Sequence, residues 1–205
     1  MLAAGDVATA AAWNVITNDI IQIGGMAQGV FTNEAARDAA ITSPTEGMHV
    51  YLTAPTVPAA TNTTILPSGI QTIYNGSVWV CVTEVGSVST AVGTTTSTSY
   101  ADISFGGAVI SVTLVTGTTA MVHLTGDIEP WGGLVNAVSV KTGSVAATDI
   151  FYTETGNAGP SGRFSTSVIF PSLTAGTNTF TVQGKTESGG TVKVTRPSLV
   201  VKGIA

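Results

Sequence analysis

The chain has 205 residues, which is enough for one large domain or two small ones. Only 9% of the residues are charged, against roughly 25% in an average globular domain, and the abundant Thr and Val are typical of β-structure with neutral polar outer faces. Residues 1–90 contain one basic and six acidic residues and residues 91–205 contain six of each, which argues against a basic face for nucleic acid.

The sequence predicts neither a signal peptide nor a membrane span. The opening stretch MLAAGDVATAAAW has no basic segment, and Asp6 interrupts its apolar run. No apolar stretch is long enough to cross a bilayer. Cys81 stands alone, so we expect a small buried side chain, no intrachain disulfide and no cysteine-based metal site.

Residues 1–25 form the first predicted unit, an anchoring or oligomerising helix over residues 6–23. Asp6 can cap its first turn, and the two glycines that follow the helix can end it. Four apolar residues recur at the spacing of a coiled-coil seam: Trp13, Ile16, Ile20 and Ile23. β-Branched Ile at such positions favours three or more strands, and the open alternative is a helix that lies on its own domain.

Residues 26–85 form the second predicted unit, a small β-hairpin stem module. A short helix over FTNEAARDAAI is expected, with Thr32 or Asn33 as its cap and Pro44 beyond its end. The stretch SPTEG, with Pro44 at its second position and Gly47 at its end, predicts a type I turn before the strand MHVYLTA.

Charged side chains near this turn raise the question of a chemical site. We expect Arg37 to pair with Glu46 or Asp38 and to stabilise the turn, by about 1 kcal/mol or less if the pair is exposed. Prolines then mark a loop, and IQTIYNGSVWVCVTE predicts a hairpin in which Asn75 and Gly76 form a type I′ turn.

Residues 86–96 are rich in small side chains and are expected to be a linker, and residues 97–205 contain about eight short strand-like runs. Several runs alternate between faces: Ile110, Val112 and Leu114; Ala120, Val122 and Leu124; Phe164, Thr166, Val168 and Phe170; Phe180 and Val182. The predicted fold is therefore mainly β, with an N-terminal helix, a small hairpin module and a C-terminal antiparallel β-sandwich of jelly-roll or immunoglobulin-like type.

Candidate catalytic residues are few. His49 and His123 lie in strand-like runs without metal-ligand spacing, and no nucleophile elbow or phosphate-binding loop is present. Asp127 and Glu129 share one side of a strand end, as glycosidase carboxylates can, but we expect solvated charges at a turn beside Pro130 and Trp131. We therefore expect no enzyme, no cofactor and no metal.

Trp131 is the leading candidate for a binding residue. It stands between Pro and two Gly, which predicts a tight loop at one end of the sandwich. An exposed loop aromatic can bind a partner, and the alternative is that Trp131 folds back to close the end of the sandwich. The neighbouring loop, Thr153–Arg163, adds Asn157 and its only cation, Arg163.

Two parts of the chain resemble virion proteins of tailed bacteriophages. ARDAAITSPTEGMHVYL followed by IYNGSVWV is similar to a module of minor tail proteins from phages of actinobacteria, and matches its pattern at Ala36–Ile41, Pro44, Glu46–Met48, Tyr51–Leu52 and Tyr74–Trp79. LAAGDVATAAAWN is similar to the opening that often precedes that module, with Ala8 where Leu is usual. TTTSTSYADI, TGTTAMVHLTG and FPSLTAGTNTFTVQGKT resemble a β-sandwich found at the ends of such proteins.

The resemblance implies a structural virion protein, most simply a minor tail or fibre protein that displays its sandwich for host attachment. It implies homotrimers, contacts with other virion proteins through the N-terminal part, and a host-surface glycan as a ligand, without nucleic acid or membrane insertion. Three alternatives remain open: a capsid decoration protein or head fibre, a carbohydrate-cleaving depolymerase, and a lectin-like module.

Overall fold

The computed structural model describes residues 28–131, 135–143, 151–154, 162–186 and 190–205. The predicted N-terminal helix with Trp13, Ile16, Ile20 and Ile23 lies outside the described residues, as does Asn157. The described helix is α2 (Glu34–Ala40). The strands, in chain order, are β1 (Gln28–Phe31), β2 (His49–Leu52), β3 (Ala59–Ala60), β4 (Thr63–Ile65), β5 (Ile70–Tyr74), β6 (Trp79–Cys81), β7 (Val85–Val88), β8 (Gly93–Thr95), β9 (Ala101–Asp102), β10 (Ser104–Phe105), β11 (Ala108–Val109), β12 (Ser111–Thr116), β13 (Thr119–Trp131), β14 (Val135–Lys141), β15 (Phe151–Glu154), β16 (Gly162–Phe170), β17 (Gly176–Thr186) and β18 (Thr191–Ile204).

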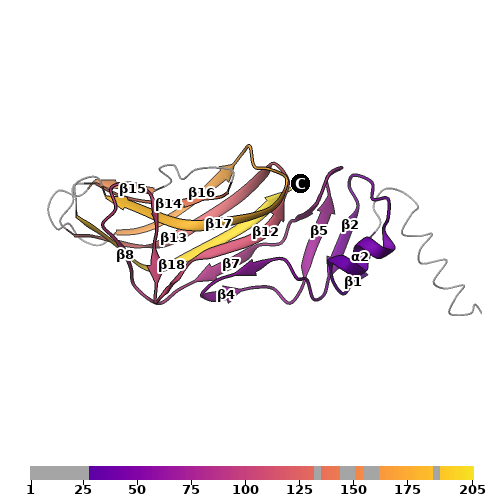
Figure 1. Cartoon of the computed structure of the whole chain (residues 1–205), viewed down its shortest axis with the longest axis horizontal. Coiled ribbons are helices and arrows are strands. Elements are labelled where there is room, and N and C mark those ends of the chain that lie inside the picture. The colour runs from indigo at the N-terminus through magenta and orange to yellow at the C-terminus, as the bar shows by residue number, and fades with distance from the viewer. Residues whose placement is uncertain (1–27, 132–134, 144–150, 155–161, 187–189) are drawn as a thin grey trace, which may run out of the picture.

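The long strands build a β-sandwich, and a small sheet lies beside one end of it (Figure 1). One layer is an eight-stranded sheet in the order β11-β10-β8-β18-β13-β16, with β7 paired to β18 and β4 paired to β7. The other layer has six strands in the order β15-β14-β17-β12-β3, with β9 paired to β17. The prediction of a mainly β chain with an antiparallel sandwich is confirmed.

Alternating apolar residues fill the space between the two layers. Ile110, Val112 and Leu114 are buried, as are the three alternating apolar residues of β13 and the pair Phe180 and Val182. Phe170 of the eight-stranded sheet meets Phe180 of the other sheet edge-to-face, with ring centroids 5.9 Å apart. The predicted shared faces of these runs are therefore confirmed.

The predicted linker over residues 86–96 is wrong. These residues include most of β7 and all of β8, which pair in succession with one edge of β18. They are strands because β18 is long, and its backbone groups on that side need partners. The proline-marked loop also contributes strands, since β3 pairs with β12 and β4 pairs with β7.

The small sheet has the order β1-β2-β5-β6, and its β1 and β2 run parallel. α2 begins after Asn33, whose side-chain oxygen accepts from the Ala36 amide at 3.0 Å, so Asn33 rather than Thr32 is the cap. The helix ends at Ala40, before Pro44. This part of the chain keeps the predicted order of helix, turn, strand and hairpin.

Both turns of this part differ in detail from the prediction. The first spans Thr45–Met48, with the Met48 amide bonded to the Thr45 carbonyl at 3.1 Å and Gly47 at φ +87°, so a type I turn beginning at Ser43 is wrong. Its third position needs positive φ, which favours Gly.

In the hairpin, the Asn75 amide donates to the Val78 carbonyl at 3.2 Å, and Gly76 has φ +87°. Gly76 has positive φ and Asn75 does not, so Asn75 and Gly76 do not form the predicted type I′ turn. Asn75 instead accepts from the amides of Ser77 and Val78 through its side chain.

Arg37 is buried, and it pairs with one of its two expected acidic partners. Its Nε donates to Asp38 at 2.8 Å, and its guanidinium carbon lies 4.8 Å from the centroid of the Trp79 ring. Asp38, and not Glu46, is thus its acidic partner. The side chain joins the helix to the hairpin by packing as well as by charge.

Cys81 is buried, as predicted, and burial raises the pKa of its thiol to about 11. No helix among the described residues combines the length and the apolar character that crossing a membrane requires.

Candidate functional site

The outer face of the eight-stranded sheet carries neutral polar side chains beside a few charges. Because side chains alternate along a strand, the buried residues of β13 place Met121, His123 and Thr125 on the opposite, outer face. Neighbouring β16 adds the exposed Ser165 and Ser167. This face carries two hollows, one toward the small sheet and one toward the far end of the sandwich, called the distal end below.

The first hollow has a volume of about 250 Å³ and is lined by Glu84, Met121, His123, Ser167, Val200, Val201 and Lys202. Within it, His123 Nδ1 lies 2.8 Å from Ser167 Oγ. A Ser nucleophile needs a His that a third group orients, and among the described residues no carboxylate is hydrogen-bonded to His123. The pair joins two neighbouring strands, as the interpretation of His123 as an ordinary strand residue predicts.

The second hollow has a volume of about 330 Å³ and is built around Asp127, which is 8% exposed. Asp127 Oδ1 accepts from Arg163 Nε at 3.1 Å, and Oδ2 accepts from Arg196 Nε at 2.6 Å and lies 2.5 Å from Arg196 Nη2. β13, β16 and β18 thus each contribute one charged residue, and we call Asp127, Arg163 and Arg196 the arginine clamp.

A β-bulge in β18 places Arg196 in the clamp. Thr125 pairs with Ser198 and Asp127 with Thr195, so two residues of β18, Arg196 and Pro197, oppose the single residue between them on β13. Arg196 has φ +51°, a left-handed conformation that is costly for a residue with a side chain. Proline is acceptable at a bulge because it has no amide to pair.

Asp127 and Glu129 are poorly suited to glycosidase chemistry. The hydrogen bond from Arg163 lowers the pKa of Asp127; burial partly opposes this, and Arg196 reinforces it. Glu129 pairs with Lys193 Nζ at 2.5 Å. A general acid needs a raised pKa, whereas the pKa of Asp127 is lowered and Glu129 is engaged in an ion pair.

The predicted turn around Pro130 and Trp131 is wrong, because both residues continue β13. Trp131 is the last residue of that strand and pairs with Thr191. Among the described residues, β16 pairs with β13 only as far as Ile128, and the residues of β13 beyond that point include Pro130, which has no amide to pair. Arg163 likewise lies in β16 rather than in a loop.

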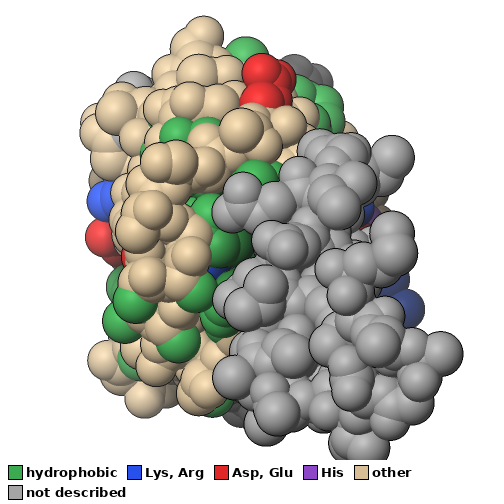
Figure 2. All heavy atoms as spheres, turned by 90° about the vertical axis from the view of Figure 1, so that its right-hand side faces the viewer, with side chains coloured by type: hydrophobic (Ala, Val, Ile, Leu, Met, Phe, Trp, Pro, Cys, Tyr) green, Lys and Arg blue, Asp and Glu red, His purple; other side chains and the backbone are tan. Residues whose placement is uncertain are grey.

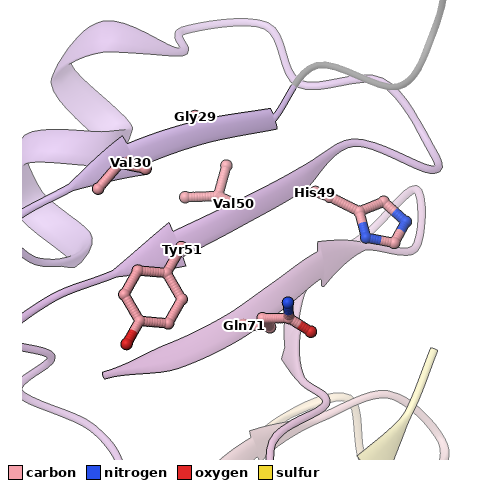
Figure 3. A pocket seen from close by; sticks show the side chains of 6 residues that line it. All are labelled: Gly29, Val30, His49, Val50, Tyr51 and Gln71. Carbon is pink, nitrogen blue, oxygen red and sulfur yellow. The ribbon is translucent and has the colours of Figure 1, made fainter. Parts of the chain in front are cut away.

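The small sheet has its own hollow, of about 110 Å³, on the face opposite its buried side chains (Figure 3). Val30 is 70% exposed there, and Tyr51 is also exposed. His49 lies at its rim beside Gln71. Figure 2 faces this end of the molecule, and its described surface is mostly neutral polar atoms with scattered hydrophobic side chains and few charges.

Metal ligation has no support in the described residues, which contain no group of three or more His, Cys, Asp or Glu able to hold an ion. The turn residues Pro44, Glu46, Gly47, Asn75 and Gly76 lie in the small-sheet part, away from the arginine clamp. The predicted binding residues Trp131 and Arg163 lie in neighbouring strands of one sheet, β13 and β16, near the distal end.

Sequence reasoning missed Arg196 and Lys193. A signal was present in TVKVTRPSLVV, where the Arg-Pro pair interrupts an otherwise alternating run and indicates a bulge. The pairing of Arg196 with Asp127 has no local signal, since 69 residues separate them in the chain.

Comparisons with known proteins gave structural likenesses only. No family model matches the sequence, and no curated protein matches it. A chain from the structure of infectious bursal disease virus, Gx strain, has a TM-score of 0.34 and 7% identity over 65% of this chain and 41% of that one. A chain of the Gt strain has a TM-score of 0.33 and 12% identity over 66% and 41%.

The CBM22-1 xylan-binding domain from Paenibacillus barcinonensis Xyn10C has a TM-score of 0.26 and 9% identity, over 58% of this chain and 87% of that domain. The present chain thus spans about 41% of the length of the two viral chains it matches. TM-scores below 0.5 assign no function.

Proposed function

We propose that this chain is a structural protein of a tailed-phage virion, in which the small sheet belongs to a stem and the sandwich is displayed for attachment to a host-surface glycan. The N-terminal part, residues 1–25, would join three copies and contact other virion proteins. This proposal takes up the resemblance of the hairpin segment and the sandwich segment to minor tail proteins.

The observation that carries the proposal is the two-ended arrangement of the molecule (Figure 1). The chain enters the described part at β1 of the small sheet. β6 of that sheet lies against β12 and β18, at the ends of these strands nearer the small sheet. The strand ends at Trp131, Gly162 and Thr191 lie together at the distal end. Such a build separates an attachment end from a displayed end.

The outer face of the sandwich suits binding better than catalysis. Hydroxyls, a His and a pair of arginines line the two hollows of this face and can offer hydrogen bonds to a sugar chain. Each contact of this kind is weak, and a trimer that presents three such faces gains avidity by linking them.

The position of the chain on the virus tests the first part of the proposal. Electron microscopy of intact particles labelled with an antibody to the sandwich is expected to place it on the tail or a tail fibre, with three-fold local symmetry. Label on the capsid would support the decoration-protein or head-fibre alternative instead, and absence of label from particles would overturn the proposal.

The oligomeric state tests the role of residues 1–25. Sedimentation of the full chain at micromolar concentration is expected to give a trimer, and Ile16→Asp with Ile20→Asp is expected to give monomers because a charge cannot be buried at a seam position. A wild-type monomer at that concentration would contradict the proposal.

Host-cell binding and hydrolysis separate the remaining alternatives. Trp131→Ala is expected to reduce binding of the full chain to host cells. If the wild-type chain hydrolysed a host polysaccharide, and Asp127→Asn and Glu129→Gln abolished that activity, the depolymerase alternative would replace this proposal.

A further inference from the structure

From the arginine clamp we infer a binding site for an oxyanion group, a carboxylate or a phosphate, carried on a cell-surface polysaccharide. The inference deepens the proposed function, on which it rests only for the source of the ligand. It concerns the hollow of about 330 Å³ lined by Thr125, Gly126, Asp127, Arg163, Phe164, Ser165 and Arg196.

The two arginines of the clamp are held in place but remain open to solvent. Their side chains are 73% and 67% exposed, whereas the Asp127 side chain between them is only 11% exposed. A guanidinium has five N–H donors, and the contacts with Asp127 engage Nε of Arg163 and Nε and Nη2 of Arg196. We call the two guanidinium groups the forks. Their other N–H donors can bind a planar carboxylate or a phosphate.

Asp127 orients the forks without cancelling their charge. Two guanidinium groups and one carboxylate leave a net positive charge at the hollow, although the whole chain has a formal charge of −5. The lowered pKa of Asp127 keeps it ionised at neutral pH, so the orientation persists where the ligand would bind.

The backbone around the clamp is shaped for this contact. Arg196 has a left-handed backbone conformation with φ +51°, and such outliers concentrate at functional sites. On the facing strand, Gly126 leaves room for the buried Phe164 ring, because a Cβ there would lie 2.9 Å from Phe164 Cζ. Thr125 and Ser165 supply hydroxyls at the rim of the hollow.

Hydroxyls beside two charged forks fit one acidic sugar unit or one sugar-phosphate unit. A purely structural tie between three strands would need the same ion pairs, but it would not need both guanidinium groups to stay open to solvent. The exposure of both forks therefore favours a ligand over a strand tie as their role.

The test measures binding of the full chain to three polymers by isothermal titration calorimetry: oligogalacturonate for carboxylates, a glycerol-phosphate polymer for phosphates, and dextran as a neutral control. Wild type is expected to bind at least one anionic polymer and not dextran. Arg163→Gln and Arg196→Gln are each expected to weaken that binding tenfold or more.

Lys141→Gln is the matched control, since it removes the same charge from β14 of the other sheet, where Lys141 also pairs with an aspartate, Asp102. It is expected to change the affinity less than twofold. Arg163→Lys and Arg196→Lys keep the charge but lose the fork, so they too are expected to weaken binding, and circular dichroism checks that every variant is folded.

Binding to one anionic polymer alone identifies the source as uronate or phosphate, and binding to both means that the oxyanion itself is recognised. The inference is overturned if wild type binds neither anionic polymer, or if Lys141→Gln weakens binding as much as the arginine variants. Labelling of the virion is independent of these residues, so its failure and the failure of polymer binding are separate results.

Discussion

Arg37 shows how a single charged side chain can serve the fold in a chain with few charges. It is 6% exposed and lies over Trp79, so its aliphatic stem and its guanidinium both contribute to packing. Its partner Asp38 is 58% exposed at the side chain. The stability therefore depends far more on the arginine than on the ion pair.

We expect Arg37→Ala to lower the free energy of unfolding by about 2 kcal/mol, through lost packing and the lost cation–π contact. Asp38→Ala removes the exposed partner and is expected to cost less than about 1 kcal/mol. Urea denaturation of both variants measures the difference, and equal losses would show that the ion pair carries the effect.

Three carboxylates make the stability of the protein depend on pH. Arg163 hydrogen bonding lowers the pKa of Asp127. Partial burial by itself would raise the pKa values of Asp102 and Glu34. Hydrogen bonds outweigh this effect and lower both pKa values. Asp102 accepts from Lys141 and Gln183, and Glu34 accepts from Thr56 and Val57. In each case the folded pKa lies below that of the unfolded chain.

As the pH falls, the unfolded chain therefore binds protons first, at about pH 4. The stabilisation is complete above about pH 5 and is lost as the pH falls through the lowered pKa values of the folded protein. We expect the free energy of unfolding from urea titrations to be similar at pH 7 and pH 5 and to decrease below about pH 4.5. Asp127→Asn should flatten this decrease, and greater stability at pH 3.5 than at pH 6 would contradict the assignment.

Among the elements, the short strand β8 is packed tightly against the core, although its sequence resembles that of a linker. Gly93 pairs with Val194 on one side and Phe105 on the other. A Cβ on Gly93 would lie 2.4 Å from Phe105 Cε1 and 2.5 Å from Ile103 Cγ2, and both of those side chains are buried. A small residue is therefore required here by packing and not by chain flexibility.

Gly93→Ala is expected to lower the free energy of unfolding by about 1–3 kcal/mol, because the added methyl overpacks the core. Gly143→Ala is the matched control, since a Cβ there has no neighbour within 4 Å. Thermal denaturation compares the two variants. If Gly93→Ala were as stable as the control, residues 86–96 would behave as the linker that their composition suggests.

For the molecule as a whole, the important feature is the sharing of strands between the small-sheet part and the sandwich. β3 and β4 lie between β2 and β5 in the chain, yet they pair with β12 and β7 of the sandwich. A boundary at residue 97 would therefore remove strands from both sandwich sheets.

We expect a chain of residues 97–205 to lack a cooperative unfolding transition, because β18 would lose its pairs with β7 and β8 along one edge. A chain of residues 28–205 keeps these pairs and is expected to unfold cooperatively. Urea denaturation followed by tryptophan fluorescence and circular dichroism compares the two, and a stable 97–205 fragment would restore the predicted boundary.

The sequence by itself determined the β-rich class, the alternating core faces, the short helix after Asn33 and the hairpin around Gly76, because each depends on residues near one another in the chain. Of the arginine clamp, it singled out Arg163 as a possible binding residue and Asp127 as a solvated charge at a turn, by residue type alone. Only the tertiary structure decided that Arg163 and Arg196 meet at Asp127, that Pro130 continues a strand, and that residues 86–96 complete a sheet. These features depend on strand pairing between distant segments, where the need to satisfy backbone hydrogen bonds outweighs local composition.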